Sequence, residues 1–212
     1  MNLCIDLCSG RGGFSRAFVE AGWEVITVDN DWKFKPTIVS DVTRLTSKEI
    51  EAKTKLGSFG KYEKVVVLAS PPCERFSLAN MHWPQRGIRK ALELVGACIE
   101  LIIDIGPHYW CLENPKGRLT WFLGKPPHCV RLSDYGYKVR MTQGRRPLGQ
   151  VFKRTALWSN FPFPLLDAEK IVNKTKGPSW SHREQRAELP YGLSKAILEA
   201  VTRKEAPLVE VE

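Results

Sequence analysis

A cysteine stands directly behind two prolines, at the end of an apolar run in the 212-residue chain. The run Val65–Ala69 has the composition of a buried strand, and Pro71 and Pro72 end it because proline lacks an N–H and fixes φ. The Cys73 thiol is therefore expected at the carboxyl end of a strand, where ligands bind in open α/β sheets. This position makes Cys73 the best candidate nucleophile. The alternative is a small hydrophobic residue at a turn, since free cysteines are commonly buried.

A glycine-rich turn follows the first expected strand, Leu3–Leu7. Residues 8–13 read Cys-Ser-Gly-Arg-Gly-Gly, and apolar residues then recur at helical spacing up to Gly22. Glycines let the backbone pass close to a ligand, and the start of the helix offers unpaired N–H groups. The spacing is neither that of a dinucleotide-binding turn nor that of a phosphate-binding P-loop. It indicates a different nucleotide-like cofactor.

Acidic residues end the next two expected strands. Glu24–Val28 is followed by Asp29, and the third strand, Pro36–Ser40, is followed by Asp41. Carboxylates accept hydrogen bonds from ribose hydroxyls and from an exocyclic amine, and S-adenosylmethionine carries both groups without a phosphate. Each aspartate alone could equally be a helix cap or a turn residue. Three successive strands that end in this way favour a cofactor site.

The remaining pattern predicts the scaffold that positions these groups. Residues 46–56 and Arg86–Ile105 have helical periodicity, and the strand Tyr109–Leu112 leads into Glu113-Asn114-Pro115. Strands that alternate with helices predict an α/β fold with a doubly wound, mostly parallel sheet. Its carboxyl rim would bring together the glycine turn, the acidic strand ends, Cys73 and Glu113. Beyond residue 116 we expect a strand at Thr155–Ser159 and a closing helix after Pro190.

Composition narrows the class of protein. The chain is 43% hydrophobic and 26% charged, with no apolar run long enough for a membrane helix and no N-terminal secretory pattern. We therefore expect a cytoplasmic protein without a membrane partner. Its six cysteines show neither Cys-x-x-Cys pairs nor zinc-type spacing, so we expect free thiols and no metal.

The positive charge is concentrated in one segment. The formal net charge is +9, and in residues 131–186 Lys and Arg outnumber Asp and Glu by 12 to 4. A local field of this sign favours a polyanionic partner through phosphate neutralisation. The alternative is a solvated face that only keeps the protein soluble.

Three blocks in this order resemble the cytosine-C5 DNA methyltransferases, particularly small phage-type or orphan members. They are Asp6–Phe14, Ser70–Ser77 and Glu113–Pro115. The resemblance implies a Rossmann-like, S-adenosylmethionine-dependent methyltransferase fold. The residues that it implies for the cofactor are Asp6, Cys8, Ser9, Gly10, Gly12, Gly13, Phe14, Asp29, Asn30, Asp41, Val42 and Pro71.

The resemblance also implies a mechanism. Cytosine C5 is a weak nucleophile, and addition of the Cys73 thiolate to C6 would activate it. Glu113 would protonate or hydrogen-bond N3, Asn114 would hold the strand end, and Arg154 would orient the base. A cytosine inside duplex DNA would have to be extruded first. The residues expected to touch nucleic acid are Arg75, Ser77, Lys138, Arg140, Arg145, Arg146 and Lys153.

The chain departs from the family pattern in its recognition region. We expect residues 1–160 to form the catalytic and cofactor-binding core, and residues 189–212 to form a C-terminal helix that packs back on it. Residues 161–188 leave only a short target-recognition segment, which is too small for an independent domain. An accessory subunit or a homodimer could complete recognition. Cys8 also replaces the phenylalanine that is usual in the family, so we expect an altered affinity for S-adenosylmethionine.

Three functions stay open. The first is a DNA (cytosine-5)-methyltransferase, in restriction-modification or another setting. The second is an RNA (tRNA) cytosine-5 methyltransferase on the same scaffold, because a basic patch does not distinguish the two sugars. The third is a catalytically silent subunit that binds DNA or the cofactor.

Overall fold

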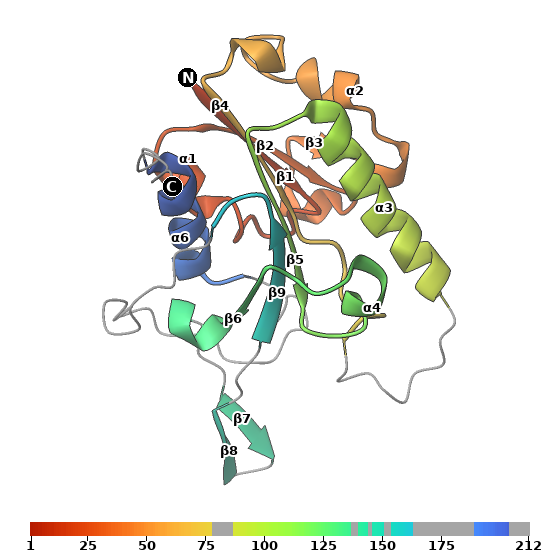
Figure 1. Cartoon of the computed structure of the whole chain (residues 1–212), viewed down its shortest axis with the longest axis vertical. Helices are drawn as coiled ribbons and strands as arrows, with labels where there is room; N and C mark the ends of the chain where they lie inside the picture. Colours follow the sequence, from red (N-terminus) through yellow and green to blue (C-terminus); the bar gives the residue numbers. More distant parts are fainter. Residues whose placement is uncertain (78–86, 137–139, 144–145, 151–153, 163–188, 204–212) are drawn as a thin grey trace, which may run out of the picture.

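A seven-stranded sheet forms the centre of the protein, in a computed structural model that describes residues 1–77, 87–136, 140–143, 146–150, 154–162 and 189–203 (Figure 1). The strand order is β3-β2-β1-β4-β5-β9-β6. The first five strands in this order run parallel, and β9 runs antiparallel to both of its neighbours. The strands are β1 (Asn2–Leu7), β2 (Glu24–Asp29), β3 (Ile38–Val39), β4 (Lys64–Ala69), β5 (Tyr109–Pro115), β6 (His128–Arg131) and β9 (Arg154–Ser159).

Helices cover both faces of this sheet, which confirms the doubly wound, mostly parallel fold (Figure 1). Helices α1 (Arg16–Glu20) and α6 (Tyr191–Thr202) lie on one face, and α2 (Ser47–Glu51) and α3 (Ile88–Ile105) lie on the other. The short helix α4 (Thr120–Leu123) follows β5. The described residues also include the 3-10 helices η1 (Trp32–Phe34), η2 (Val42–Arg44), η3 (Phe59–Lys61) and η5 (Leu132–Tyr135). A separate hairpin contains β7 (Arg140–Gln143) and β8 (Arg146–Gln150).

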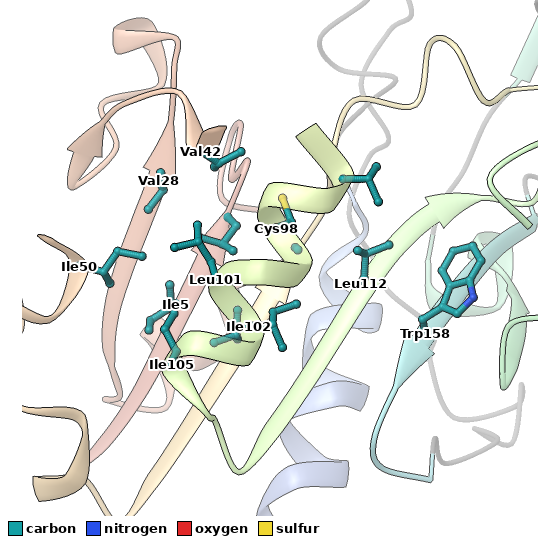
Figure 2. Close-up of a cluster of buried hydrophobic side chains, with 14 of the residues drawn as sticks. Ile5, Val28, Val42, Ile50, Cys98, Leu101, Ile102, Ile105, Leu112 and Trp158 are labelled. Atoms are coloured by element: carbon teal, nitrogen blue, oxygen red, sulfur yellow. The ribbon is translucent and has the colours of Figure 1, made fainter. Parts of the chain in front are cut away.

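Alternating side chains divide the core into two layers. On β1, Leu3, Ile5 and Leu7 pack against the α3 face, whereas Cys4 packs against the α1 and α6 face. Figure 2 shows Ile5 beside Leu101 and Ile105 of α3. Burying each such aliphatic side chain stabilises the fold by about 1.5–3 kcal/mol, so the central strands and their carboxyl ends are rigidly held.

The closing helix α6 begins after Pro190, as the sequence predicts. The backbone N–H of Ala17 donates to Ser194 Oγ over 3.0 Å, and the Tyr191 hydroxyl donates to Glu20 over 2.6 Å. These bonds attach α6 to α1, which starts directly after the glycine-rich turn. Residues 163–188 and 204–212 lie outside the described part, so the division of the chain into three segments stays a prediction.

Several element boundaries differ from those expected. The helix predicted over residues 46–56 is only Ser47–Glu51, held at its start by a Thr46–Glu49 capping box. The third strand is only Ile38–Val39. Helix α3 starts at Ile88, and Arg86 lies outside the described residues. Strand β6 and the β7–β8 hairpin fall in the segment for which the sequence predicts no elements.

All six cysteines are free. Within the described ranges, no three His, Cys, Asp or Glu side chains are grouped so that they could hold a metal ion. A search of the same residues finds no helix that could span a membrane.

Candidate active site

A cavity of about 410 Å³ opens at the carboxyl ends of the parallel strands. This volume lies in the range of small-molecule sites, roughly 300–1,000 Å³. Five acidic residues and one arginine line it: Asp29, Asp31, Asp41, Glu74, Glu113 and Arg11. Cys73 and the glycine-rich turn line it too, together with apolar side chains such as Phe14, Phe34 and Val42. The acidic lining contrasts with the net charge of +9 of the whole chain.

The glycine-rich turn is held against the end of β2. The backbone N–H of Ser9 donates to Val28 O over 3.0 Å, and that of Gly10 donates to Asp29 Oδ2 over 2.8 Å. Gly10 and Gly12 have φ values of +50° and +73°, which glycine adopts without cost. A Cβ built on either would meet no atom within 4 Å, so the turn leaves open space beside its backbone.

The aspartates at the strand ends hold turns and also line the cavity. Asp29 Oδ1 accepts from the backbone N–H of Asp31 over 2.9 Å. Asp41 caps η2 by accepting from the backbone N–H of Thr43 over 3.0 Å, and this bond lowers the pKa of Asp41. The turn and cap roles are therefore confirmed, and the cofactor contacts of both aspartates stay predictions. Their predicted neighbours Asn30 and Val42 also line the cavity.

Asp6 lies behind the turn and does not line the cavity. It is completely buried and accepts a 2.6 Å hydrogen bond from Ser15 Oγ. Its Oδ1 atom has no hydrogen-bond partner among the described residues. Burial raises the pKa of Asp6 to about 7, with a smaller contribution from the charge of Asp29. The structure thus gives Asp6 a supporting position rather than the expected direct contact; Gly12 also falls outside the lining.

Replacing Asp6 by asparagine should flatten the pH dependence of stability. The native pKa of about 7 exceeds the unfolded value of about 3.9, so the native state binds more protons between pH 4 and 7, and stability falls as pH rises through this window. Chemical denaturation measures the effect. Between pH 5 and pH 8, the free energy of unfolding of Asp6→Asn should fall by about 2–3 kcal/mol less than that of the unchanged protein. The exposed control Asp104→Asn should behave like the unchanged protein. An identical pH dependence in Asp6→Asn would contradict this assignment.

Cys73 is the first residue of a tightly bonded turn. The backbone N–H groups of Phe76 and Ser77 donate to Cys73 O over 3.0 and 2.9 Å, and the Phe76 ring is fully buried. Asn114 Nδ2 donates to Pro71 O over 2.9 Å, which joins this turn to the end of β5. Asn114 is itself buried and is not among the cavity-lining residues, and its predicted role at the strand end stays a prediction.

A second backbone bond fixes the same turn. The N–H of Arg118 donates to Phe76 O over 2.8 Å. At Gly117 a Cβ would lie 2.3 Å from Phe76 O, so only glycine permits this approach. The two connections to the segment after β5 fix where the Cys73 thiol lies relative to Glu113.

The surroundings of three other cysteines disfavour the thiolate form. Cys8 also lines the cavity, but a hydrogen bond with Cys98 and burial raise the pKa of its thiol. Burial likewise raises the pKa values of Cys4 and Cys111. A thiol held in its protonated form is a poor nucleophile, so these surroundings disfavour Cys4, Cys8 and Cys111 as nucleophiles.

Glu113 lines the same cavity although it is only 5% exposed. The buried hydroxyl of Thr155 on β9 donates to Glu113 Oε1. The sequence analysis did not single out Thr155; the neighbouring Arg154 was expected, from the family resemblance, to orient the base. Because β-strand side chains alternate, Arg154 points to the opposite face and is exposed, and the structure does not bring it to the site.

The predicted nucleic-acid contacts are only partly described. Arg75 and Ser77 are half-buried beside the Cys73 turn and are not among the cavity-lining residues. For Arg140 and Arg146 the structure describes only the backbone of the β7–β8 hairpin. Lys138, Arg145 and Lys153 lie outside the described residues. The contacts predicted for these basic residues stay predictions.

The sheet, its flanking helices and a cavity at the strand ends define a Rossmann-like methyltransferase fold. A crystal structure described as a DNA modification methyltransferase encoded within a prophage (E. coli) shares this fold. Its TM-score is 0.50 at 19% identity, over 75% of this chain and 46% of that one. Residues 3–145 match the family of C-5 cytosine-specific DNA methylases, and the chain belongs to that family.

Individual relatives are distant. The type II methyltransferase M.HgiDI of Herpetosiphon aurantiacus is 26% identical over 141 residues, which are 64% of this chain and 43% of the relative. M.HgiGI of the same organism is 25% identical over 122 residues, or 55% of this chain and 93% of the relative. M.XorII of Xanthomonas oryzae is 29% identical over 53% of this chain and 28% of the relative. The match with M.HgiDI thus spans less than half the length of that relative.

Proposed function

We propose that the protein is a DNA (cytosine-5)-methyltransferase that uses S-adenosylmethionine. One observation carries this proposal: Cys73 and Glu113, from the ends of neighbouring strands, line one cavity with the glycine-rich turn. Membership of the C-5 cytosine-specific family supports the same reaction. A DNA-modifying role would place the protein in the cytoplasm, in restriction-modification or a related process.

The two side chains suit a two-sided attack on a pyrimidine ring. The Cys73 thiolate would add to C6 of cytosine, while Glu113 would give a proton to N3 and so neutralise the charge that develops on the ring. C5 then becomes electron-rich enough to accept a methyl group. Release of the product would then need the C5 proton to pass to solvent, the N3 proton to return to Glu113, and the Cys73–C6 bond to break with its electron pair on the thiolate. The hydrogen bond of Asn114 and the backbone bonds of Phe76 would hold the Cys73 thiol and the Glu113 carboxyl group at a fixed relative position.

The lining of the cavity fits S-adenosylmethionine. When bound, this cofactor supplies a methyl group on a positively charged sulfur. It carries hydroxyl and amine donors and no phosphate. The carboxylates of Asp29, Asp31 and Asp41 can accept hydrogen bonds from these donors, and their negative charge is opposite to that of the cofactor sulfur. Phe14, Phe34 and Val42 offer apolar walls for a purine ring. A phosphorylated cofactor would instead meet an excess of negative charge.

A surface beside the cavity suits nucleic acid, and we define it as the α4 surface: Lys116, Arg118, Trp121, Phe122 and Lys125. Leu119 is fully buried and Leu123 is partly buried, which leaves Trp121 and Phe122 71% and 51% exposed. Between Pro115 and Ser133 there are four cationic residues and no acidic one. The bond from Arg118 N to Phe76 O puts α4 next to the Cys73 turn (Figure 1). Exposed aromatic and cationic side chains together are typical of nucleic-acid contact.

Replacing Trp121 by alanine should weaken DNA binding about tenfold, since the aromatic face is lost while the fold is untouched. The measurement is fluorescence anisotropy of a labelled duplex titrated with each variant at one salt concentration. Ile103→Ala is a matched control, because Ile103 on α3 is also 71% exposed. Unchanged binding by Trp121→Ala would remove α4 from the DNA interface.

The reaction can be tested with radiolabelled S-adenosylmethionine and methylation-free DNA of mixed sequence. We expect label at cytosine C5 in duplex DNA. Parallel assays with tRNA and single-stranded DNA separate this function from RNA methylation, and absence of label in every substrate would indicate a silent binding subunit. We also propose that residues 161–188 give a short recognition site, completed by a second copy or another subunit.

A further inference from the structure

We infer that Thr155 is a positioning residue that supports Glu113 in both of its protonation states. The inference rests on the proposed function, because Glu113 changes its protonation state during turnover only if it protonates the target base. Thr155 is not among the residues that line the cavity, and it would act through the general acid, Glu113.

The position of Thr155 is fixed by the sheet. Its side chain is completely buried, its hydroxyl donates to Glu113 Oε1, and the same Oγ1 lies 3.0 Å from Asn114 O. In the antiparallel pairing of β5 and β9, Thr155 stands opposite Pro115, two residues beyond Glu113 on the same face. Both strands have neighbours on each side, so neither Thr155 nor Glu113 lies on a free edge.

The chemistry of a hydroxyl fits this double contact. It has one proton to donate and two lone pairs with which to accept. When Glu113 is ionised, the hydroxyl donates to its carboxylate. When Glu113 is protonated, the hydroxyl can turn its proton toward Asn114 O and accept from the carboxyl group until the base arrives. In each state the Thr155 hydroxyl keeps a hydrogen bond to the Glu113 carboxyl group.

The proton balance is simple. The proton of Glu113 moves to N3 of the cytosine, and the Thr155 hydroxyl rotates from Asn114 O to the new carboxylate without losing its own proton. Thr155 therefore stabilises the charge that remains on the protein after proton transfer. Its loss should reduce the rate of the chemical step and leave DNA affinity unchanged.

Three variants test this role: Thr155→Val, Thr155→Ser and Thr54→Val. Valine keeps the shape and removes the hydroxyl, whereas serine keeps the hydroxyl. Thr54 is a matched control, since it is buried and its hydroxyl donates to a backbone carbonyl, Glu51 O, far along the chain from the site. Melting temperatures are measured for every variant.

Thr155→Val should lower the maximal methylation rate by about 10- to 100-fold with KM for DNA unchanged. Without its donor the carboxylate is less favoured, so Glu113 keeps its proton to higher pH and the alkaline limb of the pH–rate profile moves up by about one pH unit. Thr155→Ser should restore both properties, and Thr54→Val should show neither change. A wild-type pH profile in Thr155→Val, or a failure of serine to rescue, would overturn the inference.

A readout without turnover separates this inference from the proposed function. Carbon-13 NMR follows the titration of the Glu113 carboxyl group in the isolated protein, and its midpoint should move upward in Thr155→Val but not in Thr54→Val. Absence of methyl transfer by the unchanged protein would reject the proposed function. An unmoved midpoint would reject the role of Thr155 independently.

Discussion

Alanine in place of Cys73 should abolish methyl transfer, with a loss of about 10⁴-fold or more. The reason is that cytosine C5 is too weak a nucleophile unless a thiolate has first added to C6. The variant should keep its fold, because Cys73 is only partly buried and its turn is held through backbone atoms. Single-turnover transfer of labelled methyl groups into duplex DNA measures the effect.

A matched control is Cys129→Ala, since Cys129 is an exposed free thiol on β6. That variant should retain the activity of the unchanged protein. Residual activity of Cys73→Ala within tenfold of the unchanged protein would remove Cys73 from the mechanism and leave the cavity with a different chemistry.

Glutamine in place of Glu113 should slow methyl transfer by about 10²- to 10⁴-fold. The amide can still hydrogen-bond the base, but it cannot give a proton to N3, so the charge that forms on the ring is no longer neutralised. DNA affinity should change little because Glu113 is only 5% exposed, inside the cavity. Rates at saturating DNA, compared with binding constants, measure the two effects separately.

The exposed residue Glu63 provides the matching control, Glu63→Gln. It should leave both the rate and the affinity unchanged. Equal rates for Glu113→Gln and the unchanged protein, with both folded, would show that Glu113 is not the acid.

The sequence predicted the centre of the site because topology dictates where strand ends meet. Asp29, Asp41, Cys73 and Glu113 follow four strands that were all expected to be parallel, and these residues line one cavity. Carboxyl ends of adjacent parallel strands must share an edge, so no long-range packing information was needed.

Thr155 escaped prediction because its role depends on the register of an antiparallel strand. A shift of one residue exchanges the faces of Arg154 and Thr155, and nothing in the short run around them fixes that register. Arg154 was proposed from the family resemblance, whereas the structure buries the neutral Thr155 and exposes Arg154. The role of Asp6 was missed for a related reason, since the sequence does not show which side of the turn a carboxylate faces.

The segment after β5 was the least predictable part of the fold. Leu119 and Leu123 anchor α4, but the helix is too short to produce a clear periodicity. Strands β6, β7 and β8 are four or five residues long and contain basic residues or glycine, which hide the alternation of a typical strand. These elements form only through long-range pairing.

The central claim is a covalent bond between Cys73 and the target base, and a suicide substrate tests it most directly. A mixed-sequence duplex with every cytosine replaced by 5-fluorocytosine is incubated with the protein and S-adenosylmethionine. Fluorine occupies the position of the C5 proton that must leave, so the bond between Cys73 and C6 should persist. Mass spectrometry of the digested complex should find one nucleotide adduct on the Cys73 peptide. An adduct on Cys8, or methylated 5-fluorocytosine released without any adduct, would contradict the account.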